Sequence, residues 1–237
     1  MRYMGSKARI AKQIAPIINE AIKKSNGMLF EPFCGGCNIT PHFEGIIFAN
    51  DLNENLICLF KEAIEGRVFP EYITKEMHSA AKNGAYDKAL TAYIGFCASY
   101  RGDYFKGFAD NGCPTATGAR DYQAEQIKSF NKTVEALREM PSLTLNSLPY
   151  YELEIPDNSV IYCDPPYEGS TGYKTGSFDH ERFWQWAEEM SERNRVFVSE
   201  YSTRSDLFIP IWQQSIHNPM SSSSKRATEV LFTSLIS

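Results

Sequence analysis

The order of apolar and polar residues predicts alternating helices and strands near the start of the chain. Apolar residues at helical spacing predict an amphipathic helix over residues 6–24, with Ser6 as its N-cap. Two apolar runs, at 28–33 and 46–49, are typical of buried strands, and a short helix is expected between them over 39–43. Strand, helix and strand in this order indicate the opening of a βαβ unit.

The alternation stops in the middle of the chain. Helical patterns over 84–98 and 121–139 are separated by a stretch rich in aromatic, Gly and basic residues at 100–109 and by an expected loop over 111–118. We therefore predict a mainly helical inserted subdomain over 67–140. At least two aromatic side chains are expected in the core of this insert, from the set Tyr104, Phe105 and Phe108.

The strand pattern resumes after the insert. Asn53 is expected to cap a helix that ends near residue 65, so 1–66 and 141–237 together are predicted to form one α/β domain. Trp184 and Trp186 are expected to pack beneath its sheet. The remaining predicted elements are strands at 143–145, 159–163 and 196–199, a helix at 180–193, and a closing antiparallel pair at 212–217 and 229–233.

Composition is that of an ordinary globular protein, with 43% hydrophobic and 22% charged residues among 237. A net charge of -5 argues against a polyanionic partner, but residues 1–24 carry six basic side chains against the single acid Glu20, so the charge distribution leaves nucleic acid open. No apolar run reaches transmembrane length and no signal peptide is evident, so we expect no membrane association. Six cysteines in this context indicate reduced thiols in a cytoplasm.

The most distinctive motif is Asp164-Pro165-Pro166-Tyr167, directly after the predicted strand 159–163. Ligands bind at the carboxyl ends of strands in open α/β sheets. The prolines fix a rigid bend with free carbonyl oxygens, the Asp adds two acceptors, and the Tyr adds a flat stacking face. This set suits a planar ring that carries an amino group, and the alternative is a turn that only ends the strand.

A second candidate site lies at the start of the chain. A Gly-containing turn, 34–38, follows the first strand, and Asp51 follows the second, where an acid can accept hydrogen bonds from a ribose diol. Because the loop 31–36 is not G-x-G-x-x-G, a nucleoside without phosphates is preferred to a diphosphate cofactor. Asp51 could instead be only a helix cap, and Lys7 either contacts a ligand or is a solvated residue at a helix start.

Cys34 and Cys37 form a C-x-x-C pair between a strand and a helix. A redox site has this spacing, whereas a zinc site would need a second pair of ligands, which the scattered remaining cysteines do not supply. The simplest interpretation is two small residues in a close-packed turn. We therefore expect no metal.

Taken together, these motifs resemble one family along nearly the full chain: the DNA N6-adenine methyltransferases of the Dam type (the D12 class), in a small form of the kind that phages carry. The motif at Tyr3–Lys7 is similar to the N-terminal motif of that family, Glu31–Gly36 to its S-adenosylmethionine loop, Asn50-Asp51 to its ribose-binding acid, and Asp164–Tyr167 to its catalytic motif. Their order, with an insert before the catalytic motif, is also that of the family.

The resemblance implies a Rossmann-like methyltransferase sheet, mostly parallel with an antiparallel closing strand, and an inserted target-recognition subdomain. It implies S-adenosylmethionine as the cofactor and double-stranded DNA as the partner. The residues expected to bind or shape the site of the cofactor are Tyr3, Lys7, Glu31, Pro32, Phe33, Gly35, Asp51 and Asp164. Cys37 departs from the family, since many relatives carry Gly there, and it is expected to fit the turn with a negative φ.

The resemblance and the residues together suggest a mechanism. The target adenine is flipped out of the duplex and stacks on Tyr167, while the Asp164 carboxylate and the Pro165 carbonyl accept its two N6 hydrogens and aim the lone pair at the methyl group. Transfer is direct and needs no metal. The side chains expected to contact DNA are Arg101, Lys106, Lys225 and Arg226.

Other functions stay open at this stage. The same motifs could serve methylation of cytosine N4 or of a protein amide, or a catalytically silent binding module. The expected location is the cytoplasm of a bacterium or of a phage-infected host, with restriction–modification or phage protection as the purpose. The oligomeric state is open, with a monomer as one option.

Overall fold

The computed structural model of the chain describes residues 3, 5–100, 103–109, 113–115, 118–168, 178–216 and 227–235. Its contacts divide the chain into two compact units. Unit 1 comprises Met1–Arg9, Cys34–Pro41 and Ala49–Leu148, and unit 2 comprises Ile10–Phe33, His42–Phe48 and Pro149–Ser237. The predicted insert 67–140 lies within unit 1, and its recognition role stays a prediction.

The strands form one seven-stranded sheet in the order β5-β2-β1-β6-β7-β9-β8. The pairs β1–β6 and β6–β7 are parallel, whereas β9 runs antiparallel to both β7 and β8. This confirms the predicted fold class, including the closing antiparallel pair. The bounds are β1 Met28–Glu31, β2 Ile46–Asn50, β5 Leu143–Asn146, β6 Val160–Cys163, β7 Arg195–Glu200, β8 Phe208–Ile216 and β9 Ala227–Ser234.

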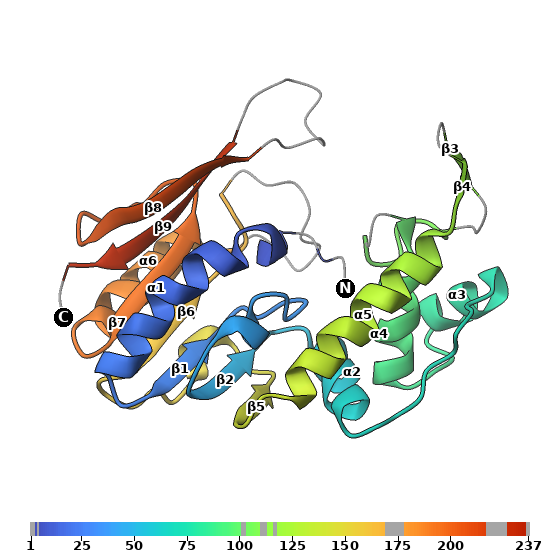
Figure 1. The fold of residues 1–237 in the computed structure, drawn as a ribbon, viewed down its shortest axis with the longest axis horizontal. Helices are drawn as coiled ribbons and strands as arrows, with labels where there is room; N and C mark the ends of the chain where they lie inside the picture. Colours follow the sequence, from blue (N-terminus) through green and yellow to red (C-terminus); the bar gives the residue numbers. More distant parts are fainter. Residues whose placement is uncertain are drawn as a thin grey trace. The chain divides into compact units, whose positions relative to one another are not determined.

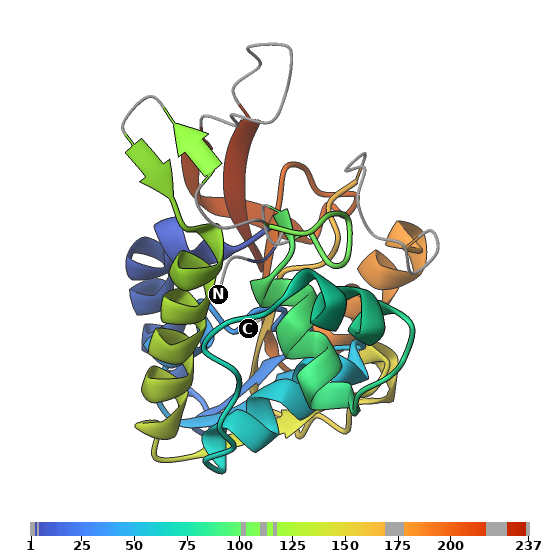
Figure 2. The same cartoon turned by 90° about the vertical axis from the view of Figure 1, so that its right-hand side faces the viewer.

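Within unit 2, helices α1 (Ala11–Lys24) and α6 (His180–Ser191) cover opposite faces of the strands (Figures 1 and 2). Alternate residues of β6 point to these two faces. Ile161 and Cys163 belong to the cluster that contains Phe183, Trp184 and Trp186 of α6, whereas the Tyr162 ring packs against Phe43. The predicted packing role of both tryptophans is confirmed. The apolar runs thus became strands that are buried on both faces.

Two predictions near the N-terminus are wrong. The α-helix begins at Ala11, because a 3-10 turn at Lys7–Arg9 precedes it, and Ser6 Oγ instead accepts from the Ala8 amide at 3.3 Å. The predicted helix over 39–43 is only a 3-10 turn, Thr40–His42. Pro41 lacks an N–H and disfavours helical geometry at the residue before it, which explains the short turn.

Unit 1 is mainly helical, as predicted for its insert. Asn53 caps α2 by accepting from the Leu56 amide at 3.3 Å, which confirms that prediction. A helix at 75–82 was not predicted, and the expected loop over 111–118 is wrong in part because 113–115 pairs with 118–120 as a hairpin. The bounds are α2 Glu54–Ile64, α3 Lys75–Lys82, α4 Lys88–Cys97, α5 Tyr122–Arg138, β3 Cys113–Thr115 and β4 Gly118–Arg120.

Close packing fixes the aromatic stretch of the insert. A Cβ added at Gly95 would lie 2.3 Å from the Tyr104 ring, so α4 needs a glycine for this ring to pack against it. Tyr104, Phe105 and Phe108 all pack partly buried against the core of unit 1, which confirms the expectation for this stretch. Buried His78 contacts the Ser99 hydroxyl at 3.1 Å, and Ser99 also accepts from the Phe105 amide at 3.1 Å.

A helix that crosses a bilayer needs about 20 consecutive, mostly apolar residues, and this sets the standard for the helices of the described residues. None of them is both long enough and apolar enough to span a membrane.

Candidate active site

Asp51 follows β2 in unit 1 and is held by the main chain through both carboxylate oxygens. Its Oδ2 accepts from the Gly35 amide and its Oδ1 from the Asn53 amide, each at 2.9 Å. Burial raises the pKa of Asp51, and the two amide donors oppose this rise. Each oxygen has a second lone pair, so the fixed carboxylate can still accept hydroxyl donors such as a ribose diol. Since Asn53 caps α2, the alternative that Asp51 is only a helix cap is wrong.

Gly35 forms the turn that Asp51 holds. Its φ of +47° lies in the left-handed region, and an added Cβ would lie 2.7 Å from Tyr3 Cε1. An added Cβ at Gly36 would lie 2.8 Å from Tyr3 Cβ. The Tyr3 ring thus lies directly against Gly35 and Gly36 of the turn, and it also packs on Phe96 with 5.6 Å between ring centroids. Lys7 is buried, and its Nζ donates to the Gly5 carbonyl at 3.1 Å.

The expectation for Cys37 is wrong, because its φ is +49°. The Cys37 amide donates to the Cys34 carbonyl at 2.9 Å, and this closure puts residue 37 in the left-handed region where Gly is favoured. Both cysteines are buried free thiols. Across the part of the chain that the structure describes, no three His, Cys, Asp or Glu side chains gather as metal ligands.

The segment after β5 is tied to the Asp51 end of β2 within unit 1, which sequence reasoning missed. The Asn50 side chain donates to the Leu148 carbonyl and accepts from the Leu148 amide, both at 2.9 Å. Ser147 Oγ donates to the Asp51 carbonyl at 3.0 Å. The exposed Leu148 side chain offers an apolar contact in this segment. The polar residues directly after the predicted strand 143–145 could have indicated this contact from the sequence.

In unit 2, the Asp164–Tyr167 motif directly follows β6, which lies between β1 and β7. The Tyr167 hydroxyl donates to Glu229 of β9. Its ring makes an edge contact with Tyr201, with centroids 4.6 Å apart and planes at 84°. Pro165 is buried, whereas Asp164, Pro166 and Tyr167 are partly exposed. The motif is therefore a fixed bend that retains access to solvent.

Glu200, the last residue of β7, supports the motif from the neighbouring strand. Its Oε1 accepts from the Glu168 amide at 2.8 Å and its Oε2 from the Tyr201 amide at 2.5 Å. Burial raises the pKa of Glu200 to about 7, with the nearby Asp164 and Glu168 charges adding to the rise. Sequence reasoning missed Glu200, although its position after the predicted strand 196–199 was a usable signal.

Several acidic side chains act on the described residues around the motif in unit 2. Burial raises the pKa of Tyr162, Cys163 and Tyr167 well above their usual values, and the Asp164 charge adds to each shift. The charges of Glu31 and Glu229 also act on Tyr162. Such a field favours positive charge at the motif and disfavours a phosphate there.

The other predicted residues of the cofactor loop belong to unit 2. Glu31, at the end of β1, is 1% exposed, and Pro32 is buried as well. The Phe33 ring packs against Tyr150 and Phe183, with centroids 5.3 and 5.7 Å apart. Phe33 thus joins an aromatic cluster beside α6.

Of the predicted DNA contacts, Lys106 is exposed and pairs with Asp103 at 3.3 Å. Arg101, Lys225 and Arg226 lie outside the described residues.

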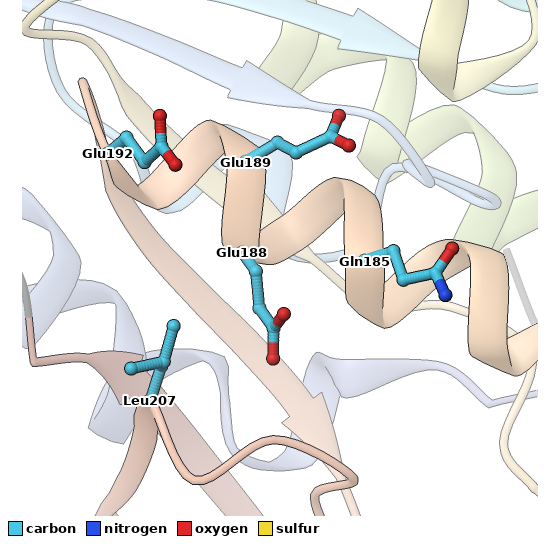
Figure 3. Close-up of a pocket in the computed structure, with 5 residues that line it drawn as sticks. All are labelled: Gln185, Glu188, Glu189, Glu192 and Leu207. Atoms are coloured by element: carbon cyan, nitrogen blue, oxygen red, sulfur yellow. The ribbon is translucent and has the colours of Figure 1, made fainter.

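A hollow of about 290 Å³ lies on α6, and none of these residues lines it (Figure 3). Its lining is acidic and would repel a polyanion. The lining residues are Gln185, Glu188, Glu189, Glu192 and Leu207.

The family of this chain follows from its match to a protein-family model. The model of the D12 class N6 adenine-specific DNA methyltransferases matches residues 3–148, which is more than half of the chain. The chain belongs to this family. It is therefore an S-adenosylmethionine-dependent enzyme that methylates adenine in DNA. The match includes Tyr3, Lys7, Gly35 and Asp51 and ends before the Asp164–Tyr167 motif.

Solved structures with a similar fold include other methyltransferases. The rRNA methyltransferase aviRa from Streptomyces viridochromogenes is 12% identical, with a TM-score of 0.42 over 98% of this chain and 86% of that one. An rRNA methylase from Streptococcus thermophilus is 8% identical, with a TM-score of 0.41 over 94% of this chain and 96% of that one. At these values the likeness adds nothing to what the sheet already establishes.

The turn of this methyltransferase gives a first prediction. Gly35→Ala should weaken S-adenosylmethionine binding roughly tenfold to a hundredfold, because the new Cβ displaces the Tyr3 ring and strains a left-handed residue. Isothermal titration calorimetry measures this. Gly84→Ala is the matched control, since Gly84 has φ +79° but open space around it. The control should cost about 1 kcal/mol of stability and leave the affinity unchanged; equal affinities for both variants would contradict this account of the turn.

Glu200 gives a second prediction, on pH. Its folded-state pKa of about 7 exceeds the ordinary value of 4.5. The contribution of Glu200 to the free energy of unfolding is therefore complete below pH 4.5 and is lost as the pH rises through 7. Glu200→Gln should therefore gain stability relative to the wild type between pH 5 and pH 8, by about 2 kcal/mol. Denaturant unfolding at both pH values measures the difference. A difference that does not change with pH would show that Glu200 titrates normally.

Proposed function

We propose that this methyltransferase acts on an adenine flipped out of double-stranded DNA, with Asp164 at the reacting amine and Tyr167 against the base. The proposal rests chiefly on one observation: an acid, a stiff bend and an anchored aromatic ring follow β6 at the carboxyl end of the parallel strands. Ligands bind at this end of open α/β sheets.

For the cofactor, we propose that Asp51 accepts hydrogen bonds from the ribose hydroxyls and that the Gly35 turn follows the nucleoside closely. The chain fits such a group, because the Asp51 oxygens are fixed by main-chain amides and the turn has no side chain at Gly35 and Gly36. The proposed cofactor-binding residues also include Tyr3, Lys7, Glu31, Pro32 and Phe33. When bound, S-adenosylmethionine supplies an activated methyl group on a sulfonium.

For the reaction, the N6 lone pair of adenine is delocalised into the ring and is a poor nucleophile. The Asp164 carboxylate and the Pro165 carbonyl accept hydrogen bonds from the two N6 hydrogens, which draws the nitrogen towards tetrahedral geometry and aims its lone pair. After the methyl group is transferred, the cationic amine releases one of these protons. Pro165 and Pro166 hold these acceptors in place. The acidic surroundings of Asp164 favour the positive charge that arrives on the amine. Tyr167 replaces part of the base stacking lost on flipping.

The alternatives weighed on sequence alone were methylation of cytosine N4, methylation of a protein amide, and a silent binding module. The family match favours adenine in DNA over all three. A methyl-transfer assay that counts label separately in DNA and in protein discriminates among them directly.

We further propose that residues 67–140 recognise the DNA target, with Arg101, Lys106, Lys225 and Arg226 contacting the DNA. The same proposal takes the chain as a small, phage-type member of the class that works in the cytoplasm of a bacterium or of a phage-infected host. Its purpose there would be protection from restriction or a restriction–modification pair. The order of the motifs along the chain supports this view.

Substitution of Asp164 tests the catalytic proposal. Asp164→Ala should lower methyl transfer to unmethylated DNA by roughly a hundredfold or more, while Asp164→Asn, which keeps one acceptor oxygen, should lose less. Transfer of a radiolabelled methyl group gives the rates, and circular dichroism checks the fold. Asp206→Ala removes an exposed carboxylate of the same unit and should be fully active. An active Asp164→Ala variant would exclude the proposed site.

Lys106 tests the DNA contact. Lys106→Ala should weaken binding to DNA of any sequence and reduce the salt dependence of binding by about one counterion, as expected for a phosphate contact. Lys88→Ala is the matched control, because Lys88 is also exposed and paired with an acid, Glu54. Fluorescence anisotropy at several salt concentrations measures both slopes. Identical slopes for the two variants would locate the contact elsewhere.

A further inference from the structure

We propose that Glu229 and Glu200 are positioning residues for the Asp164–Tyr167 motif: Glu229 sets the plane of the Tyr167 ring, and Glu200 sets the path of the main chain after it. The inference deepens the proposed function and rests on it, because it assigns to these two acids the geometry that base stacking and methyl transfer require.

Glu229 is placed to hold the ring. It lies on β9, is 5% exposed, and accepts the Tyr167 hydroxyl hydrogen. The Tyr201 contact, with ring planes at 84°, restrains the same ring from a second direction. A phenol fixed at its hydroxyl and at its ring has few orientations left, so the stacking surface is in place before a base arrives.

Glu200 is placed to hold the main chain. It is 3% exposed, and its two oxygens accept from the amides of Glu168 and Tyr201. The first bond joins the residue directly after Tyr167 to the end of β7. The ion pair between Glu168 and Arg204 is exposed, so it contributes little to holding this segment.

The pairing of the strands explains why these two acids act together. Glu200 lies opposite Val230 in the β7–β9 register, so Glu229 is next to the partner of Glu200. Both acids therefore sit on a rigid part of unit 2, one reaching the ring and the other the chain that carries it. Two nearly buried carboxylates, one of them under the influence of the Asp164 charge, are unfavourable in themselves. The amide donors to Glu200 and the hydroxyl donor to Glu229 offset the cost of burying these carboxylates, and they do so in the observed arrangement.

A double-mutant cycle tests the inference. Tyr167→Phe and Glu229→Leu remove the same hydrogen bond from opposite ends, and each should lower kcat roughly tenfold or more while leaving the KM for S-adenosylmethionine unchanged. The double variant should be no slower than the worse single variant. Glu229→Gln keeps an acceptor oxygen and should restore most of kcat. Tyr167→Phe and Glu229→Gln change little core volume, so the loss in the first and the retained kcat in the second test the role of Glu229 even where Glu229→Leu fails to fold.

The outcomes separate the two proposals. Additive losses in the cycle, or a fully active Glu229→Leu variant in an enzyme that needs Asp164, would overturn the positioning role alone. Activity that does not depend on Asp164 would overturn the proposed catalytic site. In that case the same double-mutant cycle, measured by melting temperature, still tests the coupling between Tyr167 and Glu229. Additive changes in melting temperature would overturn that coupling. For Glu200, Glu200→Gln should lower kcat while Arg204→Ala, which removes only the exposed ion pair, should not; equal effects would overturn its role.

Discussion

Parallel pairing of β1, β6 and β7 is the constraint on which the chemistry of unit 2 depends. Phe30 pairs with Ile161, and Ile161 with Val196, so the three strands end at one edge. The chain puts an acid at or just after each end: Glu31, Asp164 and Glu200. Residues separated by more than a hundred positions thus form one acidic site, because parallel strands share the direction in which they end.

Concentrating buried acids in this way is unfavourable, and the main chain compensates for it. Glu200 accepts two amide donors, and Glu229 accepts the Tyr167 hydroxyl. The compensation is incomplete, since the pKa of Glu200 remains near 7. Under the proposed function, an enzyme that moves positive charge onto an amine would gain from such a field, which is a reason for acids rather than neutral acceptors at these positions.

Unit 1 uses the main chain in a related way. Asp51 is held by two amides, and one of them belongs to the turn at Gly35, so the acid and the turn form one rigid piece. The left-handed residues at Gly35 and Cys37 let this turn close, although Cys37 carries a side chain where Gly would be unstrained. We infer that the buried packing of the Cys37 thiol offsets part of this strain.

The sequence by itself determined the strands, the mainly helical character of the insert, the Asn53 cap and the family motifs, because apolar periodicity and short motifs are local properties. It also located Asp51 and Asp164, which follow predicted strands directly. Only the tertiary structure decided the roles of Glu200 and Glu229 as partners of the motif, the short 3-10 turn at Thr40–His42, and the positive φ at Cys37. Each of these depends on what a residue meets across strands or within a closed turn, and such contacts leave no periodic pattern along the chain.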